Sequence, residues 1–130
     1  MHTNESEMMP ALAPLYHLEA EQSVLGAIFL DPSRIDEVVD SLESNDFYYY
    51  RNQILFDAMY NLYNEKIKID VVTVSEILSR KKKLEDVGGI QYISEIAVTV
   101  PTAANIKYYI NIVIEHSIKR KLVNASRKII

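Results

Sequence analysis

The last 28 residues, 103–130, contain neither proline nor glycine, and this uninterrupted stretch constrains the fold more than any other feature of the sequence. At 1.5 Å per residue, a helix over this stretch would be about 42 Å long. Its first half is apolar on two faces, one made of Ile106, Tyr109, Ile110 and Val113 and the other of Tyr108, Ile112 and Ile114. Its second half narrows to a seam typical of a coiled coil, with Ile118, Leu122, Ala125 and Ile129.

A small domain covers only one apolar stripe of such a helix, so the other stripe needs a second partner. The simplest partner is another helix or another copy of the chain. Because the helical pattern is still unbroken at Ile130, we also expect the sequence to be part of a longer protein.

The residues before this stretch predict a helical globular domain over residues 18–100, preceded by a flexible arm over residues 1–17. Helices are expected to begin near Leu18, Pro32, Asn52, Thr73 and Ile90. The first four would turn these apolar or mixed faces inward: Leu18, Gln22, Leu25 and Phe29, widened by Val24 and Ile28; Ile35, Val38, Val39 and Leu42; Ile54, Leu55, Ala58, Met59 and Leu62; Val74, Ile77 and Leu78. The predicted fold class is all-α, a compact multi-helix domain followed by one long C-terminal helix.

Local signals refine this outline. The spacing of Thr73 and Glu76 fits a capping box, which places a helix start there and argues against a long strand over residues 66–71. The pair Gly88 and Gly89 predicts a tight turn, and Pro101 ends the preceding helix. The aromatic run at residues 47–50 is interpreted as core anchoring rather than as a base-stacking platform, because it lies in an acidic part of the chain.

The composition excludes most catalytic chemistry. The chain has no cysteine, and therefore no disulfide or thiolate metal site, and its three glycines cannot supply either a phosphate-binding loop or a dinucleotide fingerprint. The three histidines, His2, His17 and His116, are not at metal-ligand spacing. We therefore predict no catalytic residue, no cofactor site and no metal site in this chain.

The sequence also lacks the features of a membrane or secreted protein. Its longest apolar run covers only residues 24–30, whereas a spanning helix needs about 20 apolar residues. The N-terminus reads MHTNESE, which is acidic where a signal peptide would be basic. We expect a cytoplasmic protein with no membrane partner.

Charge is distributed unevenly along the chain. Residues 1–78 hold 14 acidic and 4 basic residues, a net charge of −10, whereas residues 103–130 carry +5. An acidic body argues against a broad phosphate-binding surface. The basic end is interpreted mainly as a solvated helix face, with contact to nucleic acid or an acidic partner as the alternative.

Several motifs occur in a characteristic order. They are LEAEQSVLGAI at residues 18–28, IDVVTV at residues 69–74, VGGIQYI at residues 87–93 and VPTAANI at residues 100–106. Asp46-Phe47-Tyr48 and the stretch from Tyr108 to Leu122 fit the same order. Together they closely resemble the N-terminal domain of bacterial and phage replicative DNA helicases of the DnaB family, over residues 17–128.

This resemblance implies an all-helical domain whose long C-terminal helix, residues 103–130, is the first helix of a dimerisation hairpin. Pairing of hairpins would build a collar on a homohexamer, and the C-terminal domain of primase and a helicase loader would dock on that collar. The parent protein would unwind DNA with ATP and Mg²⁺ in a separate RecA-like motor domain, which this chain is expected to lack. Contact with DNA would then be made only through that motor domain.

Two sets of contact residues are predicted on this basis. The subunit interface would comprise Ile106, Tyr109, Ile110, Val113, Ile114, Ile118 and Leu122. The primase-facing surface would include Glu19, Tyr92 and Arg120.

Two other functions fit parts of the sequence. Residues 73–80, the lysines at 81–83 and the Gly-Gly turn mimic a helix-turn-helix DNA-binding regulator that a long C-terminal helix could dimerise, although few basic residues lie near the recognition helix. A stand-alone decoy or loader-like protein that binds a helicase would use the same surface as the collar domain.

Overall fold

The computed structural model describes residues 14–129, and within them it contains six α-helices, two 3₁₀ helices and no β-strand. The predicted all-α class is therefore confirmed. The elements in chain order are α2 (Leu18–Leu30), η2 (Pro32–Arg34), α3 (Ile35–Ser41), η3 (Ser44–Asp46), α4 (Tyr50–Asn64), α5 (Val71–Arg80), α6 (Gly89–Ala97) and α7 (Ile106–Ile129).

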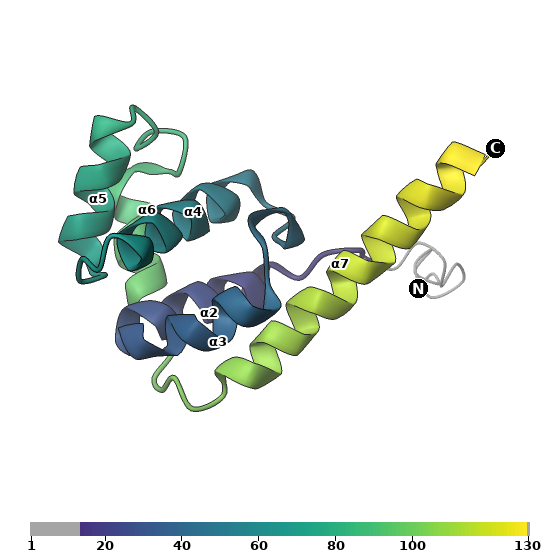
Figure 1. Cartoon of the computed structure of the whole chain (residues 1–130), viewed down its shortest axis with the longest axis horizontal. Coiled ribbons are helices and arrows are strands. Elements are labelled where there is room, and N and C mark those ends of the chain that lie inside the picture. The colour runs from purple at the N-terminus through teal and green to yellow at the C-terminus, as the bar shows by residue number, and fades with distance from the viewer. Residues whose placement is uncertain (1–13, 130) are drawn as a thin grey trace, which may run out of the picture.

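Helix α2 lies at the centre of the body and packs against α4, α6 and α7 (Figure 1). The predicted inward residues Val24, Leu25 and Ile28 are buried, but Ala20 and Ala27 are buried as well, so the helix is covered on more sides than predicted, and the prediction is wrong for Leu18, which is exposed. Gly26 allows the close approach of α6, because a Cβ at this position would lie 2.8 Å from the carbonyl oxygen of Ile96.

Helix α5 begins earlier than predicted, and the predicted capping box is displaced by three residues. Asp70 is the N-cap: its Oδ1 accepts from the backbone N–H of Thr73, whose hydroxyl accepts from the N–H of Asp70. Thr73 is therefore the third residue of α5 and not the N-cap of a helix that begins after it. Glu76 instead forms an exposed ion pair with Arg80 one turn later.

The turn before α6 is confirmed. Gly88 and Gly89 have φ angles of 102° and 73°, in the left-handed region that glycine adopts without steric cost. They reverse the chain so that α6 packs against α2 and α5, with Tyr92, Ile93 and Ile96 buried.

The aromatic run at residues 47–50 is core only at its first member. Phe47 is fully buried against Phe56, but Tyr48 and Tyr50 are exposed. The core-anchoring interpretation is therefore wrong for these two tyrosines, because the chain leaves the core after Phe47 to begin α4.

Helix α7 begins at Ile106, three residues later than predicted, because a turn at residues 103–105 precedes it, with the Thr102 hydroxyl accepting from the N–H of Ala104. It crosses the body and then extends well past it (Figure 1). Of the predicted N-terminal arm, residues 14–17 run beside α7, and residues 1–13 lie outside the described part of the chain. Within residues 14–129, no helix has the length and apolar character needed to cross a membrane.

Candidate interaction surfaces

The apolar residues of α7 divide between the domain's own core and its surface. Ile106, Ile110 and Val113 are buried against the body, so their prediction as subunit-interface residues is replaced by a core role. Tyr109 and Ile114 are partly buried at the edge of that core. The reason is that the face formed by residues 106, 110 and 113 is the one that α7 turns toward α2 and α3.

The remaining two predicted interface residues lie on the free part of α7. Ile118 is 51% exposed and Leu122 is 65% exposed. With Ile114 they follow one another at intervals of four residues, so they form a single stripe along the helix. We call Ile114, Ile118 and Leu122 the apolar stripe.

A cluster of polar contacts joins the body to α7 just beyond the buried core. Ser117 Oγ donates to Asp46 Oδ1 over 2.6 Å, and Lys121 Nζ lies 3.0 Å from the same oxygen. The Asp46 carbonyl accepts from Arg120 over 2.6 Å. We call these four residues the Asp46 cluster.

The charge of Asp46 is held in this cluster although its side chain is nearly buried. Burial raises the pKa of Asp46 more than any one donor lowers it, but the Glu43 N–H, the Ser117 hydroxyl and the Lys121 ammonium together bring the pKa below its ordinary 3.8. The carboxylate therefore stays ionised and serves as an acceptor for α7.

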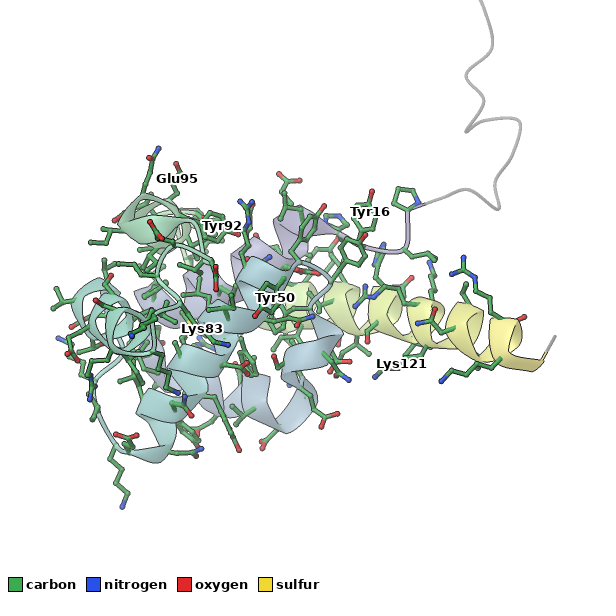
Figure 2. All side chains as sticks on the ribbon, turned by 90° about the horizontal axis from the view of Figure 1, so that it is seen from above. Tyr16, Tyr50, Lys83, Tyr92, Glu95 and Lys121 are labelled. Carbon is green, nitrogen blue, oxygen red and sulfur yellow. The ribbon has the colours of Figure 1, made fainter. Side chains whose placement is uncertain are left out.

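Arg120 also holds the N-terminal segment against α7. Its guanidinium donates to the carbonyl of Leu15 over 2.8 Å and lies 5.5 Å from the ring centroid of Tyr48, which in turn stacks on Tyr16 at 4.4 Å. Figure 2 shows Tyr16 close to the α7 ribbon. An open groove of about 430 Å³ runs between this segment and α7, and its far side is lined by Val123, Asn124 and Arg127.

A second buried network fastens the start of α4 to α2. Glu21 Oε2 accepts from the backbone N–H of Tyr48 over 2.7 Å, and Oε1 accepts from Asn52 Nδ2 over 2.9 Å. Asn52 then accepts from the Tyr92 hydroxyl over 2.5 Å. Burial raises the pKa of Glu21 by more than these donors lower it.

The three predicted primase-facing residues do not form one surface. Tyr92 is buried in the Glu21 network, which corrects its placement on the outside of the domain. Arg120 is partly buried and donates hydrogen bonds to two backbone carbonyl groups of its own chain. Glu19 is exposed and lines a different groove, with His17, Pro101, Tyr108 and Tyr109.

Sequence reasoning missed the roles of Glu21, Asp46, Ser117 and Lys121. All four lie within the motifs that carry the family resemblance, but nothing in the sequence links Asp46 to partners 71 and 75 residues away. Within residues 14–129, no group of three or more His, Asp or Glu side chains is placed to hold a metal ion.

The geometry does not support the helix-turn-helix alternative. Helix α6, in the position of a recognition helix, carries no lysine or arginine and buries Tyr92, Ile93 and Ile96 in the core. A recognition helix needs its side chains free to reach base edges.

The described residues form an all-helical body with one projecting helix that carries an exposed apolar stripe, an arrangement typical of a protein-interaction domain. Comparison with known families makes this assignment specific. Residues 13–115 match the family described as the DnaB-like helicase N terminal domain. The chain belongs to this family, as the sequence resemblance implied.

Individual relatives agree with this assignment. The chain is 41% identical to the replicative DNA helicase DnaB of Geobacillus stearothermophilus over 95% of its own length, and 46% identical to the replicative DNA helicase DnaC of Bacillus subtilis over 89%. These matches cover 27% and 26% of the two relatives, so the chain spans about a quarter of their length.

Solved structures show the same fold. The N-terminal domain of DnaB helicase from Mycobacterium tuberculosis superposes with a TM-score of 0.85 at 41% identity, covering 88% of this chain and 80% of that domain. The corresponding domain from Helicobacter pylori superposes with a TM-score of 0.76 at 27% identity, covering 98% of this chain and 95% of that one.

Proposed function

We propose that this domain is the N-terminal collar domain of a hexameric replicative DNA helicase, and that it mediates subunit assembly and the docking of primase and loader. The observation that carries the assembly part is the apolar stripe: Ile118 and Leu122 lie on a half of α7 that the body does not cover. Exposed apolar residues aligned on one helix face are typical of a helix–helix interface.

Primase docking is supported by a relative. The Helicobacter pylori domain, which shares this fold, is described together with its interactions with primase. We infer that the C-terminal domain of primase contacts this chain as well, with Glu19 as an exposed contact residue. Unwinding of DNA would belong to the parent protein, whose motor domain would bind ATP and Mg²⁺ and make the contacts with DNA, and which would act in the cytoplasm.

The assembly proposal is tested by size-exclusion chromatography with light scattering. The wild-type chain should self-associate at high micromolar concentration, whereas Ile118→Asp and Leu122→Asp should be monomers with unchanged helical content. Val72→Asp on α5 is a matched control, since Val72 is also apolar and exposed but lies far from the stripe in the sequence. A wild-type chain that stays strictly monomeric would contradict a self-sufficient interface.

The docking proposal is tested by titrating the primase C-terminal domain, and separately the loader, into the labelled chain. Glu19→Lys should weaken primase binding, and Val72→Asp should not. Unchanged affinity for Glu19→Lys would remove Glu19 from the surface.

The decoy or loader-like alternative would use the same surface, so a binding experiment does not distinguish it from a collar domain. The gene sequence does. The reading frame beyond Ile130 should continue into a linker and a GxxxxGK[ST] loop. A stop codon directly after Ile130 would instead favour a stand-alone helicase-binding protein.

A further inference from the structure

The segment from Asp46 to Tyr49 is held on both sides by different helices. On one side, Glu21 of α2 accepts from the backbone N–H groups of Tyr48 and Tyr49. On the other side, the Asp46 carboxylate accepts hydrogen bonds from Ser117 and Lys121 of α7. This short segment therefore links the direction of α7 to the central helix of the body.

The contacts of Asp46 lie where α7 leaves the body. Up to residue 128 of α7, Val113 is the last buried apolar residue and Ser117 is the last buried residue of any kind. Residues 117, 120 and 121 share one face of the helix, and all three reach Asp46. Residues 122–128 are all exposed except Val123, which is partly buried. Figure 2 shows Lys121 at the point where α7 begins to project beyond the body.

Apolar packing alone would not fix the direction of the projecting half. The last buried apolar residue of the described helix is Val113, so apolar contacts such as those of Ile110 and Val113 do not reach the projecting half that carries Ile118 and Leu122. Hydrogen bonds to a charged acceptor are short and directional. Asp46 is 7% exposed, and its carboxylate accepts from Ser117 Oγ, from Lys121 Nζ and from the backbone N–H of Glu43, 2.7 Å away.

We infer that Asp46 is a positioning residue that fixes the angle at which α7 leaves the body, and so fixes where the apolar stripe is presented to a second copy. The part that concerns the second copy rests on the assembly function proposed above; the part that concerns the angle of α7 does not.

The angle is measured by the distance between two spin labels in one chain. The chain has no cysteine, so Asn64→Cys at the end of α4 and Ser126→Cys on the projecting half label it uniquely. Both positions are exposed, and an excess of unlabelled chain removes distances between copies. Wild type should give one narrow distance distribution.

Asp46→Ala should broaden that distribution about twofold or more, as expected for an element released from its local contacts. Ser117→Ala and Lys121→Met, which each remove one partner, should broaden it less. Val74→Ala on the core face of α5 is the control for lost stability, since it leaves a cavity in a helix that packs against α4 and α6 and lies away from α7 (Figure 1). An unchanged distribution in Asp46→Ala, or equal broadening in Val74→Ala, would overturn the inference.

Self-association separates this inference from the proposed function. Asp46→Ala should weaken self-association about tenfold, the effect expected from losing hydrogen bonds to a charged group. If the label distances broaden while self-association is unchanged, Asp46 still positions α7, but the claim that it positions the stripe for a second copy is refuted. If wild type does not self-associate, the distance measurement alone decides the role of Asp46.

Discussion

Glu21 is 1% exposed, and its two carboxylate oxygens serve the backbone of residues 48 and 49 and the side chain of Asn52. This buried carboxylate is tolerated because these donors replace water. The network continues through Asn52 to Tyr92, so three helices depend on one side chain.

We expect Glu21→Ala to lower the free energy of unfolding by about 2–4 kcal/mol, because it leaves buried N–H donors without an acceptor. Glu21→Gln keeps one acceptor oxygen and should cost less. Urea denaturation followed by circular dichroism measures both. Equal losses for the two variants would contradict this account, because Gln keeps the side-chain volume and one acceptor oxygen and should preserve part of the network.

The raised pKa of Glu21 also predicts a pH dependence. In the folded state the carboxyl holds its proton to a higher pH than in the unfolded state, so stability should fall as pH rises from the ordinary value of 4.5 through the folded pKa. Wild type should therefore lose stability relative to Glu21→Gln as the pH rises through this window.

Asp46 should give the opposite dependence of stability on pH, because its pKa is lowered. Wild type should lose stability relative to Asp46→Asn as pH falls through the folded pKa, below the ordinary 3.8. Urea titrations of the three proteins at several pH values measure both effects. A difference that stays flat with pH would contradict the assigned environment of the residue concerned.

At the scale of the element, the two halves of α7 have different surroundings: the first packs against the body and the second projects beyond it. Periodicity identifies apolar residues on it but does not say what covers them, because a core face and an interface face have the same spacing. The structure assigns Ile110 to the core and Ile118 to the surface. The two residues are identical in type and stand two turns apart, so they form a matched pair.

We expect Ile110→Ala to cost about 2–5 kcal/mol of unfolding free energy, because it leaves a cavity in the core. Ile118→Ala in dilute, monomeric protein should change it by no more than about 0.5 kcal/mol. Urea denaturation at low protein concentration measures both values. A large loss for Ile118→Ala under these conditions would show that the body covers the projecting half.

At the scale of the whole molecule, the sequence predicted the helical body well where apolar residues recur at helical spacing. Ile35, Val38 and Leu42 are buried as expected, as are Ile54, Leu55 and Met59. It failed where burial depends on distant neighbours. Glu21 and Asp46 belong to residue types that are rarely buried, and their partners lie up to 75 residues away, so no local pattern marks them. For the same reason Tyr92 was misplaced on the surface.

The charge of the whole molecule bears on what it binds. Between Lys119 and Lys128 there are five basic residues and no acidic one, while the body is strongly acidic. Two of these bases, Arg120 and Lys121, are engaged with Asp46 and Leu15. The cationic surface left on α7 is therefore small, and the acidic body repels a polyanion that approaches it.

We accordingly expect no binding of duplex DNA by this chain at 150 mM salt, a condition at which weak electrostatic contacts to phosphate are largely lost. Fluorescence anisotropy of a labelled duplex measures this, and at low salt any signal should disappear in a Lys119→Ala, Arg127→Ala, Lys128→Ala variant. Loss of the signal in Lys81→Ala, Lys82→Ala, Lys83→Ala instead would place the contact at α5 and α6 and revive the helix-turn-helix alternative. Binding that persists at 150 mM with a steep salt dependence would contradict the assignment of DNA contact to another domain of the parent protein.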